Sequence, residues 1–92
     1  MRKGILKLIK NFVFRDVDIV DYEIKNYIYG DVEKYEIEVY VADKYSDEEI
    51  NEMLDKLKSS IKMLGLKHVH GSKYNFTEKK VIYITVVGEL PL

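Results

Sequence analysis

Most residues of the segment 18–43 alternate between hydrophobic and polar side chains with a period of two, on either side of Gly30-Asp31. Successive side chains of a strand point to opposite faces, so this pattern indicates two strands that each bury one face. A two-residue turn places both hydrophobic sets on the same face, and glycine readily adopts the positive φ that a type II′ turn requires. The segment therefore predicts an antiparallel hairpin with Ile24 opposite Ile37. The same register pairs Tyr22 with Val39, Val20 with Val41, and Lys25 with Glu36.

Residues 46–66 carry the pattern of an amphipathic helix with signals at both ends. Ser46 stands three residues before Glu49, which is the spacing of a capping box. Gly65 follows the last helical turn and predicts a left-handed cap, with Leu66 folding back as in a Schellman motif. The hydrophobic stripe expected to face the core comprises Ile50, Met53, Leu54, Leu57, Ile61 and Leu64.

The first residues predict a shorter helix that ends between Asn11 and Val13. Hydrophobic residues repeat at helical spacing, which favours packing against the core. The same stripe flanked by lysines is also typical of a helix that rests on a membrane surface or on nucleic acid. Residues 1–15 carry five basic and no acidic side chains, so an anion attracted over a distance would bind here. The hydrophobic positions are Ile5, Leu8, Ile9 and Phe12, and the basic ones are Arg2, Lys3, Lys7, Lys10 and Arg15.

Residues 67–90 predict a second hairpin with its turn at Thr77–Lys79, of either two or three residues. A change of one residue in the turn reverses every side chain of one strand relative to the other. A two-residue turn leaves Lys73 facing the core, whereas a three-residue turn buries Tyr74 and Phe76 there and frees the lysine. We therefore favour the three-residue turn.

Both histidines, His68 and His70, lie in this hairpin two residues apart, so on a strand their imidazoles point the same way. Under the favoured register His70 lies near the core as a neutral imidazole with one hydrogen-bond partner. Under the other register the pair lies on an open face and could bind a metal. Two histidines are one or two ligands short of a catalytic zinc site, and no HExxH spacing supplies the rest. We expect a structural role and no cofactor, with His68 and His70 as weak metal candidates.

These elements predict one α+β domain over residues 1–92, because a chain of this length has room for a single core. Two helices can cover only one face of a four-stranded sheet. We therefore expect a two-layer fold with a mainly antiparallel four-stranded sheet, two helices on one face, and the order αββαββ.

The composition excludes several classes of site. The chain has no cysteine, which excludes disulfides, thiolate catalysis and cysteine-ligated metals. No hydrophobic run reaches the roughly 18–20 residues of a membrane span, and lysines interrupt the first hydrophobic segment before a signal peptide forms. The five glycines are too scattered for a phosphate-binding loop. We expect a cytoplasmic protein with no enzymatic activity and no evident small-molecule substrate.

Tyrosine is unusually frequent, with eight residues. Several tyrosines are expected on the sheet face away from the core, where they would serve self-association or stack single-stranded bases. Acidic side chains on the same face would repel a phosphate backbone, which favours self-association. The residues expected to form this interaction surface are Lys25, Tyr27, Tyr29, Tyr40 and Tyr83.

The sequence thus predicts a small interaction or regulatory module that acts as a homodimer, through the open face or by edge-strand pairing. The alternative is a nucleic-acid-binding accessory protein that uses the basic N-terminal segment. Abundant lysine, glutamate and isoleucine, without glutamine or cysteine, are typical of thermophiles and indicate a thermophilic archaeon or an archaeal virus as the source.

Overall fold

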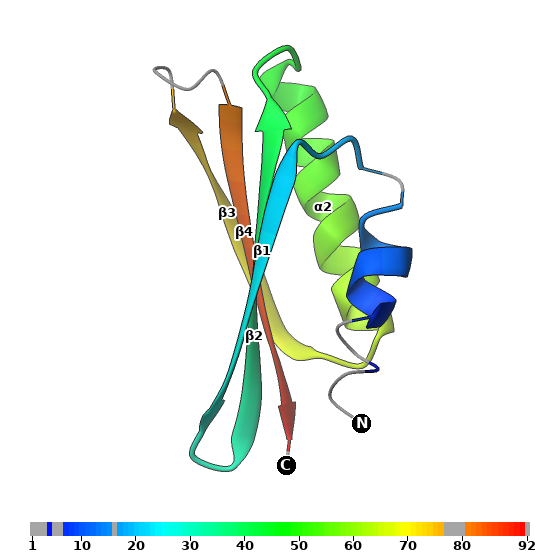
Figure 1. The fold of residues 1–92 in the computed structure, drawn as a ribbon, viewed down its shortest axis with the longest axis vertical. Coiled ribbons are helices and arrows are strands. Elements are labelled where there is room, and N and C mark those ends of the chain that lie inside the picture. The colour runs from blue at the N-terminus through cyan, green and yellow to red at the C-terminus, as the bar shows by residue number, and fades with distance from the viewer. Residues whose placement is uncertain (1–3, 5–6, 16, 77–80, 92) are drawn as a thin grey trace.

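The structure, a computed structural model, describes residues 4, 7–15, 17–76 and 81–91. Its elements are η1 (Ile9–Val13), β1 (Asp21–Tyr29), β2 (Val32–Ala42), α2 (Asp47–Met63), β3 (Lys67–Phe76) and β4 (Val81–Pro91). The strands form one antiparallel sheet in the order β1-β2-β4-β3, and both helices lie on the same side of it (Figure 1). The expected α+β class and antiparallel sheet are confirmed. The expected order αββαββ describes succession along the chain only, whereas in the sheet β4 lies between β2 and β3.

The first hairpin has the predicted register. Ile24 pairs with Ile37, and the turn consists of Gly30 and Asp31. Gly30 has a φ of 65°, whereas the φ of Asp31 is not positive. A single positive φ, at the first of the two turn residues, is characteristic of a type II′ turn. The predicted pairs Tyr22–Val39 and Lys25–Glu36 also form.

The helix α2 has the predicted signals at both ends. The hydroxyl of Ser46 accepts a hydrogen bond from the Glu49 N–H at 3.2 Å, and the Glu49 carboxylate accepts one from the Ser46 N–H at 3.0 Å. At the other end Gly65 has a φ of 97°, and Leu66 donates its N–H to the carbonyl of Ile61 at 3.4 Å. These bonds form the capping box and the Schellman motif that the sequence predicts.

The short N-terminal helix ends at Val13, within the expected range, but its last turn is a π-helix. Phe14 donates its N–H to the carbonyl of Ile9, five residues earlier, at 3.2 Å. Ile9 is fully buried, whereas Leu8, expected in the same hydrophobic stripe, is 47% exposed. A π-turn holds more residues than an α-turn and so rotates the stripe. Ile5 lies outside the described residues.

The favoured register of the second hairpin is wrong, whereas the side-chain faces of β3 are those that the alternative register predicts. Phe76 pairs with Val81 and Tyr74 with Tyr83, so Tyr74 shares a face with Tyr83 and Lys73 lies opposite Ile84. The predicted turn at Thr77–Lys79 lies outside the described residues. This pairing is displaced by one residue from the pairing that the favoured three-residue turn requires, which reverses the faces of β3.

The corrected register changes the environment of several side chains on β3. His70 and Tyr74 are exposed on the face away from α2, rather than facing the core. Lys73 lies opposite the buried Ile84 on the helix side and is half-buried. A lysine tolerates this position because its methylene stem packs on hydrophobic surface while its ammonium group reaches water.

Two glycines of the sheet face hydrophobic side chains of α2 and of the segment that follows it. A Cβ atom on Gly71 would lie 2.8 Å from Cδ1 of Leu54, and one on Gly88 would lie 2.7 Å from Cδ2 of Leu66. The absence of a side chain therefore lets α2 and the segment after it lie close to β3 and β4. The helix contacts these two strands and η1, and β1 lies at the opposite edge of the sheet.

The core lies between the two helices and the central strands β2 and β4. Side chains of β2 and β4 that point toward the helices are almost completely buried, in agreement with the predicted alternation. The carboxylate of Glu33 is buried there too and accepts a hydrogen bond from the hydroxyl of Tyr35. The buried hydrophobic residues are Ile9, Phe14, Val17, Tyr35, Ile37, Val39, Val41, Ile50, Leu57, Ile61, Leu66, Ile82, Ile84 and Val86.

Candidate interaction surface

The face of the sheet away from α2, here called the open face, is not covered by any helix of the described residues (Figure 1). Its side chains come from all four strands, because alternate residues of each strand point to this side. It therefore offers a continuous surface across the sheet. The open face comprises Asp21, Glu23, Lys25, Tyr27, Tyr29, Val32, Lys34, Glu36, Glu38, Tyr40, His70, Ser72, Tyr74, Tyr83, Thr85, Val87 and Glu89.

Three tyrosines form a row across one end of the open face. Tyr40 pairs with Tyr83, which pairs with Tyr74. The ring centroids of Tyr40 and Tyr83 are 5.1 Å apart, and those of Tyr83 and Tyr74 are 6.0 Å apart. These are the separations and tilted geometries that aromatic pairs prefer. The sequence reading missed Tyr74, because the wrong hairpin register assigned it to the core.

The other predicted tyrosines lie toward the opposite end of the same face. Tyr27 pairs with Lys34, six residues along β1 from Asp21, which lies opposite Tyr40. Six residues of strand span about 20 Å. Tyr29 lies further still, beside the hairpin turn. The five predicted surface residues therefore share one face, as expected, but they do not form one cluster.

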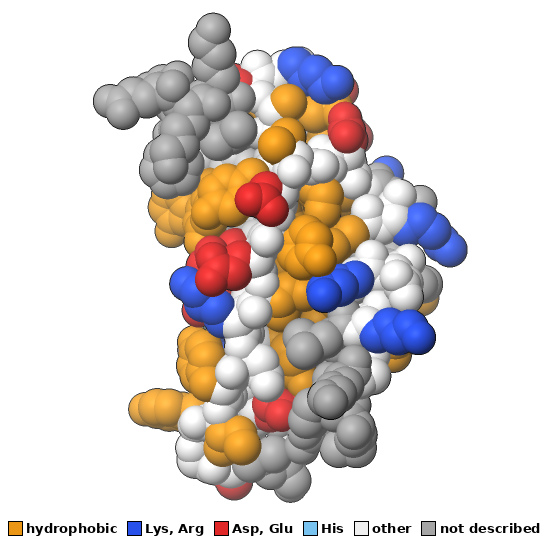
Figure 2. All heavy atoms as spheres, in the orientation of Figure 1, with side chains coloured by type: hydrophobic (Ala, Val, Ile, Leu, Met, Phe, Trp, Pro, Cys, Tyr) orange, Lys and Arg blue, Asp and Glu red, His pale blue; other side chains and the backbone are white. Residues whose placement is uncertain are grey.

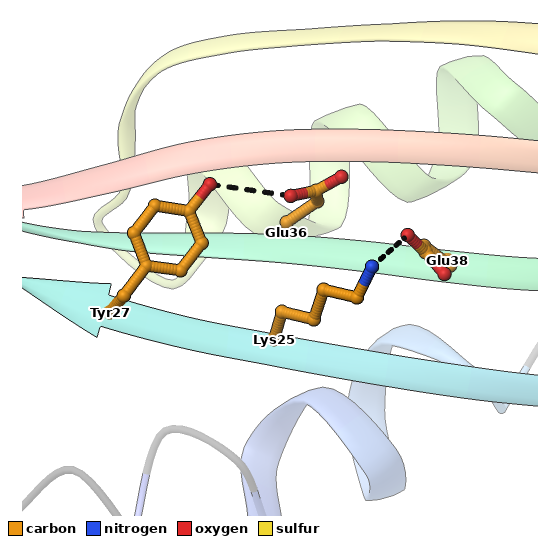
Figure 3. A network of polar contacts seen from close by, with 4 residues as sticks. All are labelled: Lys25, Tyr27, Glu36 and Glu38. Atoms are coloured by element: carbon orange, nitrogen blue, oxygen red, sulfur yellow. Dashed lines mark hydrogen bonds and ion pairs between the residues drawn. The ribbon is translucent and has the colours of Figure 1, made fainter.

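Charged side chains fill the middle of the open face (Figure 3). Lys25 stands opposite Glu36 in the strand pairing, but its ammonium group lies 3.0 Å from Oε1 of Glu38. Glu36 accepts a hydrogen bond from the hydroxyl of Tyr27 at 3.3 Å. Glu38 also stands opposite Glu23, so the lysine offsets the repulsion of two facing carboxylates.

The network shifts the pKa values of its members. Burial raises the pKa of Glu38, but hydrogen bonds from Tyr83 and Lys25 and the charge of Lys25 outweigh burial, so the pKa lies below its usual range. The hydrogen bond to Glu38 raises the pKa of Lys25. Burial, together with the neighbouring Glu38, raises the pKa of Tyr83. At neutral pH the centre of the open face therefore holds a stable carboxylate, an ammonium group and a protonated phenol.

We expect the substitution Glu38→Gln to lower stability at neutral pH and to have progressively less effect in acid. The folded protein lowers the pKa of Glu38 below its ordinary value of 4.5, so the ionised carboxylate stabilises the fold above that pH. This contribution is lost as the pH falls through the lowered pKa. Urea-unfolding midpoints of the protein and the variant should therefore converge at low pH. Glu52→Gln, on the exposed surface of α2, controls for the loss of one charge; a difference for Glu38→Gln that persisted in acid would contradict the assignment.

The histidines lie at an irregularity of β3. The pairing with β4 shifts between Lys67 and His70, and His68 adopts a left-handed φ of 54°. Nδ1 of His68 lies 3.0 Å from Oε2 of Glu89, and Nδ1 of His70 lies 3.1 Å from the carbonyl oxygen of His68. Within the described part of the chain, no group of three or more histidines or carboxylates is arranged to hold a metal ion.

The basic N-terminal residues that the structure describes, Lys7, Lys10 and Arg15, are all exposed. Lys10 lies with its ammonium group 5.7 Å from the ring centre of Tyr22, on the helix side of β1. The tyrosine row lies on the other side of the sheet, so the basic residues and the row do not form one surface. The predicted residues Arg2 and Lys3 lie outside the described residues.

The edge strand β1 exposes hydrophobic side chains on both of its faces. Five of the eight large hydrophobic side chains exposed among the described residues fall at positions 20–29. Tyr22 (39%) and Ile28 (66%) lie on the helix side, and Tyr27 (41%) and Tyr29 (75%) on the open face. Figure 2 shows hydrophobic side chains on both sides of the backbone of β1.

The hydrophobic set expected in the core from β1 is therefore only partly buried. Ile24 is half-buried, whereas Val20 is 65% exposed and does not form the expected pair with Val41, because the strand begins one residue later. Val20 instead donates its N–H to the carbonyl of Tyr40 at 2.6 Å. The sequence reading missed this exposure, because periodicity marks the hydrophobic face of a strand and not whether a helix covers it.

No family model matches this chain, and neither does any curated protein or any solved structure. None of the helices in the described residues has the length and hydrophobicity required to cross a membrane.

Proposed function

We propose that the protein is a small, non-enzymatic interaction module that acts as a homo-oligomer. The observation that carries this proposal is the concentration of exposed hydrophobic side chains along β1. Contiguous exposed hydrophobic surface costs free energy in water and marks sites where proteins associate. The neighbouring polar groups support an interaction role over a catalytic one, because Lys25, Glu38, Tyr27 and Glu36 are engaged with one another.

Light scattering coupled to size-exclusion chromatography tests the proposal over a range of protein concentrations. We expect a mass of twice that of one chain, falling toward that of one chain on dilution. Ile28→Lys should weaken association, because it places a charge in the exposed hydrophobic surface of β1. Met63→Lys is the matched control, since Met63 is 75% exposed on α2 and should leave the mass unchanged. A monomer at the highest concentration would overturn the proposal.

The second candidate function is nucleic-acid binding by the basic N-terminal segment, favoured by the exposure of Lys7, Lys10 and Arg15. The same chromatography tests it, with a single-stranded oligonucleotide added at low salt. Binding through these residues should form a heavier complex that dissociates steeply as salt is raised, because neutralised phosphates release counterions. Unchanged elution of protein and oligonucleotide at low salt would eliminate this candidate.

A further inference from the structure

The outer edge of β1 presents backbone hydrogen-bonding groups that point away from β2. The two-residue turn makes Tyr29–Val32 a hydrogen-bonded pair, and hydrogen-bonded pairs then recur at every second residue. Odd-numbered residues of β1 therefore bond to β2, and the even-numbered residues 22–28 point their N–H and C=O groups outward. In agreement, the N–H of Tyr22 donates to the side chain of Asp21 at 2.8 Å.

This edge is well suited to accept another strand. Nine residues of β1 pair regularly with β2, without a bulge or a proline. Strand edges that avoid pairing are usually short or bulged, whereas β1 is long and regular and carries exposed tyrosine and isoleucine side chains beside its outward-pointing backbone. Figure 2 shows this backbone accessible between the hydrophobic side chains of the two faces.

We propose that β1 pairs antiparallel with β1 of a second copy of this chain, with Ile24 opposite Ile24 of the second copy. The proposed strand pairing rests on the proposed self-association, and it assigns β1 as the strand through which two copies associate. Ile24 is an outward-pointing position, so the two residues at the two-fold axis exchange both of their backbone hydrogen bonds. Tyr22 and Asn26 of opposite copies form the next such pairs.

The side chains of β1 are complementary in this register. Glu23 of each copy lies opposite Lys25 of the other, so the symmetry creates two opposite-charge pairs. The charged side chains of the two edge strands thus lie opposite partners of the other sign.

Outward-pointing residues of β1 can also pair with one another when the two-fold axis passes through a neighbouring residue. In each of these registers the charged side chains are arranged less favourably. Centring the pairing on Lys25 places two ammonium groups opposite each other. Centring it on Glu23 pairs Asp21 with Lys25 but places two Glu23 carboxylates directly opposite each other at the axis. Centring it on Tyr22 places Asp21 opposite Glu23, and centring it on Asn26 creates no opposite-charge pair. Like charges directly opposite each other destabilise a strand pair, so the register centred on Ile24 is favoured.

Cysteine cross-linking of the full chain tests both the strand and the register, because the chain has no cysteine of its own. In Ile24→Cys the two Cα atoms would lie roughly 5.5 Å apart across the axis, within the range of a disulfide. In the control Ile28→Cys they would lie about 26 Å apart, because eight residues of strand separate them. Under mild oxidation we expect a covalent dimer of Ile24→Cys to form at least about tenfold faster than that of Ile28→Cys.

A second variant, Ile24→Pro, removes the N–H that both central hydrogen bonds need. This N–H does not serve β2, so the folded chain should keep its circular dichroism spectrum, as prolines on open strand edges permit. Light scattering should then show a shift from dimer to monomer.

The results of these experiments distinguish pairing through β1 from self-association in general. A monomeric wild-type chain would overturn both. A dimer that Ile24→Pro leaves intact, or that cross-links no faster through Ile24→Cys than through Ile28→Cys, would overturn pairing through β1 while leaving self-association standing.

Discussion

Replacing Leu57 by alanine is expected to lower the free energy of unfolding by about 2–5 kcal/mol. Leu57 is 1% exposed in the middle of α2, the one long helix of the described residues, and belongs to the hydrophobic core. Truncation removes its buried methyl groups and leaves a cavity that neighbouring side chains fill only in part. For a domain of this size such a loss is a large share of the total stability.

The matched control is Met63→Ala on the same helix. Met63 is 75% exposed, so its truncation should change the stability by less than about 0.5 kcal/mol. Urea unfolding followed by circular dichroism, at one fixed protein concentration, measures both variants. Equal effects of the two substitutions would contradict the placement of α2 with Leu57 toward the sheet.

The second large effect is expected for Gly71→Ala, which should destabilise the protein by about 1–3 kcal/mol. The added Cβ would lie 2.8 Å from Cδ1 of Leu54 and 2.8 Å from the carbonyl oxygen of Thr85. A leucine side chain can rotate, but the carbonyl belongs to the backbone of β4, so the strand itself must move. The strain therefore spreads to the centre of the sheet.

Ser72→Ala provides the comparison for this substitution. Ser72 is the next residue of β3, exposed on the open face, and its truncation should cost less than about 0.5 kcal/mol. Unfolding of both variants is measured in urea under the same conditions. A Gly71→Ala variant as stable as the wild type would show that α2 does not approach β3 as closely as the structure indicates.

The elements with strong local signals could be predicted in detail. The turn at Gly30-Asp31 fixes the register of its hairpin, because the turn length and the alternation of both strands agree. Ser46 and Gly65 likewise fix the two ends of α2 through bonds to residues a few positions away. In each case the deciding interactions lie within a short stretch of sequence.

The second hairpin and the exposure of β1 depend on contacts that local sequence does not encode. Residues 77–80 lack a two-residue turn signal, and a change of one residue there reverses His70 and Tyr74. Whether Ile28 is buried depends on where α2 lies, and the helix lies over β3 and β4, where Gly71 and Gly88 leave room. In the sequence, the scattered positions of the glycines exclude a phosphate-binding loop. They do not indicate that two of these glycines allow the helix to pack closely on the sheet.

The central position of β4 has a consequence for the order of folding. Val32 pairs with Pro91 and Ala42 with Val81, so the middle of the sheet joins segments that are far apart along the chain. The β1–β2 hairpin and α2 need only local contacts, whereas closing the loop between β2 and β4 costs entropy that slows folding. During synthesis, the residues of the hairpin and the helix are therefore made before those of the strand that joins them. The hydrophobic layer closes only when β4 inserts between β2 and β3.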